Sequence, residues 1–359
     1  MKRANIITVH VGANFGSNLQ AIATCKLLER LGLEPQIVNY VPYRTTWKGY
    51  FNLSGSIFNI VRRLYSAPNK WLNDKIYNNF LAKHVKVSKA IYPWNSFTKL
   101  CPTADYYVTG SDQVWNSKYN GGIDGRYFWE GISGRKIAYA ASMGNDGLTE
   151  EEKKRFSELL KDYKAISVRE KSAQEALGGI GIKSTHVLDP TIMLNKEEWK
   201  EYASTKYIKE PYLLVYLPYN TVDVNLTYRT IRKIAKKKNL KVISFSWHYW
   251  ADKLADKTIK YATPGDFLSL MIHADYVVTN SFHGTAFSIN LNKQFSAYLP
   301  SSFSTRLLSL LKLCNIENRL LNDEITEEQI DEQIDFDKIN FILEEERVKA
   351  LNFLKVALQ

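Results

Sequence analysis

The sequence predicts an α/β fold made of two Rossmann-like domains, and three observations support this prediction. Short apolar, β-branched runs recur along the chain, and each ends in polar residues that precede a helical pattern. The pattern Ala-Asp-Tyr-x-Val-Thr occurs at 104–109 and again at 274–279, at similar depths in two similar-sized halves. Chance is the alternative explanation of this repeat, because the pattern suits any strand start. The length of 359 residues is large for one hydrophobic core and comfortable for two domains.

The first half opens with a strand, a glycine-bearing turn and a helix. Residues 4–9 predict the strand, residues 12–18 carry two glycines, and residues 19–31 have the amphipathic pattern of a helix. The spacing GxxxG differs from the dinucleotide-binding pattern GxGxxG, so the glycines need only permit a tight turn. The polar side chains of the turn are better candidates for contact with a ligand: Asn14, Ser17 and Asn18.

After a second strand near 36–40, residues 41–103 form an insert that is rich in aromatic and basic side chains. Between positions 44 and 89 there are nine Lys and Arg residues and a single acid. The insert is predicted to contain two helices, at 56–66 and 70–84. Two interpretations remain open: a helical subdomain that packs its rings on the sheet, or an acceptor platform where rings stack on sugars and cations meet lipid phosphates.

The rest of the chain alternates strands and helices in the same way. The predicted strands are 104–109, 136–141, a short strand ending at 168, 185–188, 212–217, 241–247, 276–278 and 294–299. The predicted helices are 149–161, 171–177, 224–238, 264–273, 304–313 and 336–358. Because ligands of open α/β sheets bind at the carboxyl ends of the strands, the polar residues at these ends mark the functional edge.

Composition and charge exclude several classes of protein. Hydrophobic residues are 45% and charged residues 24% of the chain, which argues against a disordered or fibrous protein. The three cysteines are far apart and form no disulfide framework, so we expect a reducing, cytoplasmic environment. No apolar run suits a signal peptide or reaches the ~18 residues of a membrane span. The net charge of +11 suits nucleic acid, an anionic membrane or an anionic substrate, but no nucleic-acid-binding motif occurs, so we expect no nucleic acid partner.

The stretch 274–288 predicts a strand, a polar turn that contains His283, and the start of a helix. A helix N-terminus presents N–H groups and a positive dipole end, which suit a phosphate. Residues 276–316 contain no Asp or Glu but include three cations, Lys293, Arg306 and Lys312. This segment is therefore predicted to bind an anion.

Five motifs, GSDQVWN, AYAAS, SVRE, LDPT and SFHG, occur in this order and together resemble the polysaccharide pyruvyl transferase family. The resemblance extends from the Asn14-Phe15-Gly16 turn to the helix that carries Arg306. It implies a GT-B-like fold in which two Rossmann-like domains face each other across a cleft and a C-terminal helix crosses back. It also implies transfer of a pyruvyl group from phosphoenolpyruvate to hydroxyls of a cell-surface polysaccharide precursor, with formation of a pyruvate ketal and release of phosphate.

The resemblance assigns roles on the donor side. Arg169 matches an arginine that holds the donor carboxylate, a task that suits a guanidinium because it can bind both oxygens; a structural ion pair with Glu170 or another acid is the alternative. His283 matches a catalytic histidine that contacts the phosphate and donates a proton. The remaining expected donor contacts are Phe282, Gly284, Ser281 and Arg306. Many family members have an arginine at the position of Ser281, so Arg306 or Lys293 is expected to supply the missing cation.

On the acceptor side, Asp112 follows the strand at 104–109 and is predicted to be the catalytic base. An Asx turn or a helix N-cap is the alternative role for this residue. The expected acceptor and cleft contacts are Asn14, Ser17, Asn18, Gln113, Trp115 and His248. No His, Cys or Asp cluster has the spacing of metal ligands, so we expect no metal and no cofactor, with phosphoenolpyruvate as co-substrate.

The predicted domains are 1–192, with the insert on the acceptor side, a linker at 193–210, a phosphate-binding domain at 211–335, and a helix at 336–359 that packs back. The basic insert suggests contact with the inner face of the cytoplasmic membrane and a polyprenyl-diphosphate-linked glycan acceptor. A GT-B glycosyltransferase with a nucleotide-sugar donor is the competing hypothesis, and the acid-free segment disfavours it because such enzymes grip the donor ribose with an acid. A third hypothesis is a non-catalytic glycan-binding protein, against which the presence of both Arg169 and His283 counts.

Overall fold

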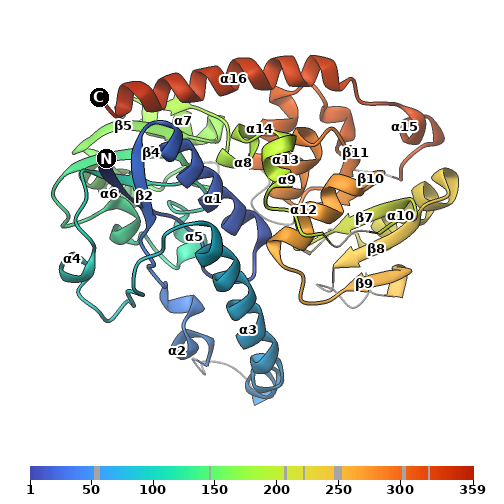
Figure 1. The fold of residues 1–359 in the computed structure, drawn as a ribbon, viewed down its shortest axis with the longest axis horizontal. Coiled ribbons are helices and arrows are strands. Elements are labelled where there is room, and N and C mark those ends of the chain that lie inside the picture. The colour runs from blue at the N-terminus through green and yellow to red at the C-terminus, as the bar shows by residue number, and fades with distance from the viewer. Residues whose placement is uncertain are drawn as a thin grey trace. The chain divides into compact units, whose positions relative to one another are not determined.

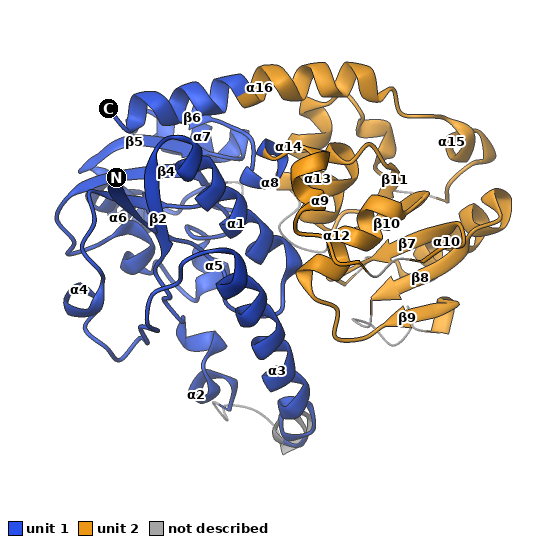
Figure 2. Ribbon diagram, in the orientation of Figure 1, with its two compact units in different colours: residues 1–193, 348–359 blue, residues 194–347 orange. Residues whose placement is uncertain are grey.

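The computed structural model describes residues 1–51, 57–144, 147–205, 208–220, 223–245, 253–300, 305–321 and 324–359. The chain divides into two compact units: unit 1 comprises residues 1–193 and 348–359, and unit 2 comprises residues 194–347 (Figure 2). Each unit is built on one parallel sheet with helices, which confirms the predicted α/β class with two Rossmann-like domains.

Unit 1 contains a six-stranded parallel sheet in the order β2-β1-β3-β4-β5-β6. Figure 1 labels β2, β4 and β5 of this sheet. Its strands are β1 (Lys2–Ile7), β2 (Leu33–Ile37), β3 (Tyr106–Thr109), β4 (Arg135–Ala141), β5 (Tyr163–Val168) and β6 (Thr185–His186). Its helices are α1 (Phe15–Arg30), α2 (Trp47–Tyr50), α3 (Ile57–His84), α4 (Phe97–Leu100), α5 (Ser117–Asn120), α6 (Glu150–Leu160), α7 (Lys171–Gly178) and α8 (Pro190–Met193), with 3₁₀ turns η1 (Tyr43–Thr45) and η2 (Gly125–Phe128). The winding direction reverses between β1 and β3, so the loops after these two strands form the switch point at which doubly wound sheets bind ligands.

Unit 2 contains a five-stranded parallel sheet in the order β11-β10-β7-β8-β9. Its strands are β7 (Tyr212–Tyr216), β8 (Lys241–Phe245), β9 (Lys257–Ile259), β10 (Tyr276–Thr279) and β11 (Gln294–Ala297). Its helices are α9 (Lys196–Lys200), α10 (Val224–Lys238), α12 (Pro264–His273), α13 (Phe282–Asn290), α14 (Thr305–Leu313) and α15 (Glu327–Asp331), with the 3₁₀ turn η3 (Glu317–Arg319). The winding direction reverses between β7 and β10, which places a second switch point at the loops after these strands.

The two copies of the repeated pattern occupy equivalent places, since β3 lies beside β1 and β10 lies beside β7. The Asp105 carboxylate accepts a hydrogen bond from the backbone N–H of Arg3 at 2.7 Å, and the Asp105 N–H donates to the Arg3 carbonyl at 3.0 Å. Asp275 makes the same two bonds with Tyr212, at 2.9 and 3.0 Å. The repeated Asp therefore fixes the switch-point strand against the first strand of each sheet.

Helix α16 (Phe336–Ala357) contributes residues to both units. At its end the carbonyl of Leu358 accepts from the hydroxyl of Tyr106 at 2.5 Å, and the carbonyl of Gln359 accepts from Arg135 at 3.3 Å. Both partners belong to the sheet of unit 1, so the predicted C-terminal crossing helix is present.

Of the suggested linker at 193–210, residue 193 is counted with unit 1 and the remainder with unit 2. Trp199 of α9 is fully buried, and its ring lies 5.2 Å from the ring of Phe287 in α13. The carbonyl of Leu194 accepts from the side chain of Asn290 at 2.7 Å. This segment thus supports the helix that follows β10.

Three predictions about the elements were wrong. The helix expected at 19–31 begins at Phe15, so Ser17 and Asn18 belong to α1 rather than to the turn before it. The second strand is Leu33–Ile37 rather than 36–40, because the pairing of β1 with β2 ends at Ile37 and residues further on make only isolated bridges. The two helices expected in the insert are one helix, α3, which continues through Pro68. An internal proline removes one backbone hydrogen bond. Pro68 is exposed, so water can satisfy the carbonyl that loses its donor.

Candidate functional site

The switch point of unit 1 brings the turn after β1 to the loop after β3. Asn14 caps α1 by accepting from the N–H of Ser17 at 3.2 Å. The hydroxyl of Ser17 in turn donates to the carboxylate of Asp112 at 2.5 Å. Asn18 is fully buried and donates to the carbonyl of His10 at 3.0 Å. Three of the predicted acceptor residues and the predicted base therefore lie together at this edge of the sheet.

Asp112 has a left-handed backbone, with φ of 69°. Asp and Asn adopt this conformation more readily than most residues because their short side chains bond to the nearby backbone. The Asp112 carboxylate accepts from the N–H of Gln113 at 2.9 Å, a bond to the next residue, whereas an Asx turn bonds to the residue after that. The same carboxylate also meets Ser17 and Arg169, so this local bond does not exhaust its contacts.

Arg169 lies at the end of β5, fully buried among carboxylates. Its guanidinium contacts Asp189 at 2.5 Å, Asp112 at 3.3 Å and Glu170 at 3.8 Å. It also donates to the hydroxyl of Ser111 at 3.2 Å. Burial by itself lowers the pKa of Arg169, but the three carboxylates outweigh burial and raise the pKa. The Arg169 guanidinium is therefore charged, and carboxylates of the same chain hold it in place.

This environment bears directly on the expected role of Arg169. The side chain of Arg169 has no exposed surface, and three carboxylates surround its single positive charge. A donor carboxylate at this guanidinium would therefore compete with three carboxylates of the chain itself. The pair with Glu170, considered as the alternative, is present but is the longest of the three, and Asp189 is the shortest contact. Asp189, from the LDPT motif, was not assigned a role from the sequence.

The AYAAS motif forms an irregular pairing between β4 and β5. The register shifts between Ala138 and Ala141, and Ala140 has a positive φ of 52°. The hydroxyl of Ser167 donates to the carbonyl of Ala138 and accepts from the N–H of Ala140, both at 3.1 Å. Such bulges redirect the side chains that follow. Here the next residue, Ser142, donates its hydroxyl to the carboxylate of Glu170.

Gln113 and Trp115 serve packing in this structure. Gln113 is buried and accepts from the side chain of Asn116 at 2.7 Å. Trp115 lies in the hydrophobic core, where its ring stacks on Phe128 with centroids 5.3 Å apart. Trp115 is 2% exposed, and its packing in the core argues against the expected contact with an acceptor sugar.

In unit 2, the switch point lies between the loops after β7 and β10. Thr279, the last residue of β10, donates its hydroxyl to the carbonyl of Tyr216 at 2.7 Å. Asn280 exchanges two bonds with the backbone of Tyr219, accepting at 3.4 Å and donating at 2.7 Å. These bonds fix the turn that leads into α13.

Ser281 is the N-cap of α13 and accepts from the N–H of Gly284 at 3.3 Å. An arginine cannot accept this bond, so the serine found here gains a capping function in place of a cation. Gly284 packs against the preceding strand: a Cβ at this position would lie 2.2 Å from the hydroxyl oxygen of Thr279. The Ser-Phe-His-Gly motif thus encodes a cap and a close approach of helix to strand.

His283 is buried in the first turn of α13, and its ring lies 5.1 Å from that of Phe282. The guanidinium carbon of Arg306, from α14, lies 5.7 Å from the Phe282 ring. Arg306 is also buried, so a positive charge lies beside the N-terminus of α13. The structure thus brings together Ser281, Phe282, His283 and Arg306, and Gly284 lies in the same turn as the first three.

Lys293 does not supply the missing cation, which corrects one expectation. Its ammonium donates to the carbonyl of Ala274 at 3.0 Å. Ala274 precedes β10, whereas Ser281 follows it, so the two residues lie at opposite ends of this strand. Burial lowers the pKa of Lys293 to about 8. His248, the remaining predicted cleft residue, lies outside the described residues.

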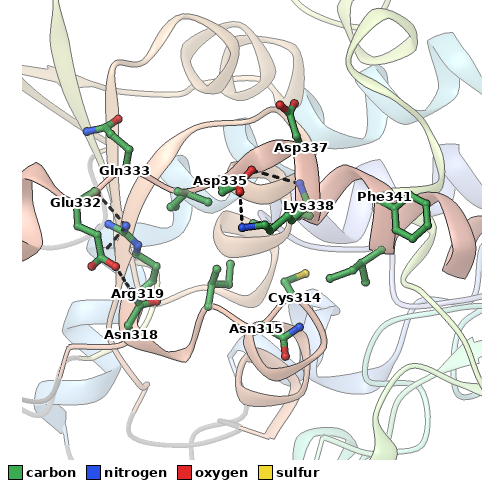
Figure 3. Close-up of a pocket in the computed structure, with 14 residues that line it drawn as sticks. Cys314, Asn315, Asn318, Arg319, Glu332, Gln333, Asp335, Asp337, Lys338 and Phe341 are labelled. Carbon is green, nitrogen blue, oxygen red and sulfur yellow. Dashed lines mark hydrogen bonds and ion pairs between the residues drawn. The ribbon is translucent and has the colours of Figure 1, made fainter.

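Unit 2 also contains a cavity of about 720 Å³ around the end of α14, η3 and the start of α16 (Figure 3). Its walls carry both charges, including an ion pair of 2.9 Å between Lys338 and Asp335. None of the predicted donor or acceptor residues lines it. Among the described residues, no three His, Cys, Asp or Glu side chains are arranged to hold a metal ion.

Comparison with solved structures defines the class of this fold. MnaA of S. aureus, solved with UDP, is 11% identical with a TM-score of 0.53, over 92% of this chain and 86% of that one. UDP-N-acetylglucosamine 2-epimerase from Rickettsia bellii is 9% identical with a TM-score of 0.51, over 99% and 98%. HepE of Anabaena, in complex with UDP, is 9% identical with a TM-score of 0.50, over 100% and 99%. These similarities identify a GT-B fold.

The family follows from the sequence itself. The model of the family described as polysaccharide pyruvyl transferase matches residues 14–302, so the chain belongs to this family. The match begins at the N-cap of α1 and includes the ends of all the strands from β2 to β11. A search among curated proteins found no match.

Proposed function

We propose that this protein transfers the pyruvyl group of phosphoenolpyruvate to two hydroxyls of a surface-polysaccharide precursor. Membership of the polysaccharide pyruvyl transferase family carries the proposal. The residues at the two switch points support it, because they offer an acid and positive charge in unit 2 and a carboxylate base in unit 1.

The donor phosphate is assigned to the N-terminus of α13. The first turn of a helix directs N–H groups and the positive end of its dipole toward an anion. Arg306 adds a full charge beside Phe282, and the 276–316 segment contains no acid to oppose it. His283, in the same turn, is placed to hold or donate a proton next to the bound phosphate.

The reaction needs one acid and one base. His283 protonates the methylene carbon of phosphoenolpyruvate, and the resulting electrophilic carbon accepts the first sugar hydroxyl, whose proton passes to Asp112. The second hydroxyl then attacks the same carbon as the C–O bond to phosphate breaks. Its proton restores His283, and the proton held by Asp112 is released to solvent and balanced by protonation of the departing phosphate, so that one ketal and one phosphate form from one donor and two hydroxyls. Arg169 and Ser17 hold the Asp112 carboxylate in one orientation, which makes them positioning residues in this scheme.

The test is turnover with a panel of free and polyprenyl-diphosphate-linked glycans. An acceptor should gain the mass of pyruvic acid less one water, with one phosphate released per product. Donor labelled with ¹³C at the carbon that bears the phosphate should give a ketal carbon without attached hydrogen. His283→Gln should lose at least 10²-fold in turnover, the usual contribution of a general acid. His273→Gln is the matched control, because His273 lies at the end of α12, where its ring bonds to the carbonyl of Ser269.

A nucleotide-sugar donor is the second candidate, because the similar structures of MnaA and HepE were solved with UDP. The two donors are distinguished in the same assay. Transfer of a sugar from a UDP-sugar, with no product from phosphoenolpyruvate, would replace the first proposal by the second.

A further inference from the structure

Helix α3 carries an apolar stripe that faces outward. Its members recur at intervals of three and four residues, which places them on one face of the helix. Val61 and Leu64 are each 58% exposed, Tyr65 is 86% exposed and Trp71 is 55% exposed. Pro68 and Lys75 continue the same face and are exposed as well. We call Val61, Leu64, Tyr65, Pro68 and Trp71 the α3 stripe.

The rest of α3 is anchored, so the stripe is a fixed surface. In the C-terminal half of the helix, Tyr77 is 2% exposed and stacks on Phe15 of α1 with ring centroids 5.6 Å apart. In the N-terminal half, the hydroxyl of Tyr50 from α2 bonds to the carbonyl of Arg63 at 3.1 Å and to Ser66 at 2.6 Å. Residues of α3 that face α2 are thus occupied, and the exposed apolar side chains lie on the other side.

The charge of the surrounding segment indicates what covers the stripe. Between positions 44 and 89 there are nine Lys and Arg residues, and the single acid, Asp74, is paired with Lys70 at 2.6 Å. Lys75 lies beside the stripe, with its ammonium 5.2 Å from the Trp71 ring. Helices that combine Trp, Tyr and Leu on one side with flanking cations lie in the interface of anionic bilayers.

We propose that the α3 stripe docks this protein on an anionic lipid bilayer. The aromatic and aliphatic side chains enter the boundary between headgroups and acyl chains, and the cations of the insert meet lipid phosphates. The contact is peripheral: in the part of the chain that the structure describes, no helix combines the length and apolar character needed to cross a bilayer. A second copy of the chain would not match this charge, because two such basic segments repel each other.

The test is co-sedimentation of the full-length protein with vesicles. Wild type should bind phosphatidylcholine vesicles that contain phosphatidylglycerol at least tenfold more tightly than pure phosphatidylcholine vesicles, and high salt should weaken this binding. Leu64→Ser with Tyr65→Ser should reduce binding at least tenfold. The matched control is Phe341→Ser with Val356→Ser, which removes two side chains of α16 that are each 67% exposed and should change binding less than twofold.

A charge variant measures the electrostatic contribution to vesicle binding separately from the apolar contribution. Lys75→Gln should weaken binding to anionic vesicles about fivefold, the share of one cation near the surface. Lys236→Gln, on the exposed side of α10, should leave binding unchanged. Equal binding to neutral and anionic vesicles, or full binding by the stripe variant, would overturn the proposal. So would a dimer of the wild type, seen by light scattering, that the stripe variant converts to a monomer. These measurements use no donor, so they stand or fall independently of the pyruvyl transfer chemistry.

Discussion

Replacing Arg169 by methionine tests the carboxylate cluster of unit 1. The substitution keeps much of the side-chain volume but removes the positive charge from among Asp189, Asp112 and Glu170, whose side chains are at most 6% exposed. Breaking a buried ion pair by removing one partner costs about 3–5 kcal/mol, because the remaining charge has no compensation. In a unit of this size, each kcal/mol lowers the melting temperature by about 2–4 °C, so a fall of roughly 6–20 °C is expected.

Hydrogen exchange read by mass spectrometry locates this loss. Peptides from β4 and β5 in unit 1 should exchange faster in Arg169→Met, whereas peptides from β7 and β10 in unit 2 should keep their protection. Arg155→Met is the matched control: Arg155 also meets two carboxylates, Glu130 and Glu158, but at the surface, where such pairs contribute about 0–1 kcal/mol. If Arg169→Met were no less stable than Arg155→Met, the guanidinium would not be the centre that holds these acids, and its buried charge would be available for a ligand.

The remaining predictions concern unit 2. Gly284→Ala should lower the free energy of unfolding, measured with urea, by about 1–3 kcal/mol, because the new Cβ would lie 2.2 Å from the Thr279 hydroxyl. Gly178→Ala, where a Cβ would have nothing within 4 Å, should cost nothing. Equal effects of the two substitutions would contradict the close packing at Gly284. Ser281→Asp should keep the cap of α13 and leave the melting temperature unchanged, because Asp also caps helices. It should weaken phosphoenolpyruvate binding, measured by calorimetry, at least tenfold, because it adds a negative charge where the phosphate is assigned. Unchanged affinity would place the phosphate elsewhere. The pKa of Lys293 is lowered from 10.5 to about 8, so between these pH values Lys293 is protonated in the unfolded state but not in the folded state. The stability of wild type should therefore rise with pH in this window relative to Lys293→Met. Parallel curves of stability against pH for the two proteins would count against the lowered pKa.

The sequence predicted most of the later strand ends well, because hydrophobic periodicity and polar turns are local signals. The strand and helix around His283 and the helix at 224–238 were located in this way, and the structure has α10 at Val224–Lys238 and α13 directly after the Ser281 cap. The repeated Ala-Asp-Tyr pattern also had a local cause, since the Asp bonds to the backbone of the neighbouring strand in both sheets.

The partners of Arg169 were harder to predict because they come from separate loops. Asp112 follows β3 and Asp189 follows β6, so their approach to Arg169 depends on the order of strands in the sheet rather than on sequence spacing. Trp115 stood in a polar motif, and only its packing against Phe128 shows that it belongs to the core. The strand β9 (Lys257–Ile259) is three residues long and has no apolar pattern, so periodicity could not detect it.

The sequence left two roles open for the aromatic residues of the insert, packing on the sheet or binding. In the structure, the aromatic residues of α3 differ in this respect according to their position along the helix. Tyr77 packs inward on α1, whereas Tyr65 and Trp71 remain exposed. Aromatic content alone cannot distinguish these cases, because the direction of each side chain depends on which face of the helix meets the sheet.

The identity of the donor is the central claim, and thermal unfolding in the presence of candidate donors tests it without an acceptor. Phosphoenolpyruvate at a hundred times its dissociation constant should stabilise wild type by about 2.7 kcal/mol and raise the melting temperature, whereas UDP at the same concentration should not. The rise should be lost in Ser281→Asp and kept in His273→Gln. Stabilisation by UDP and none by phosphoenolpyruvate would contradict the account and assign the site to a nucleotide-sugar donor.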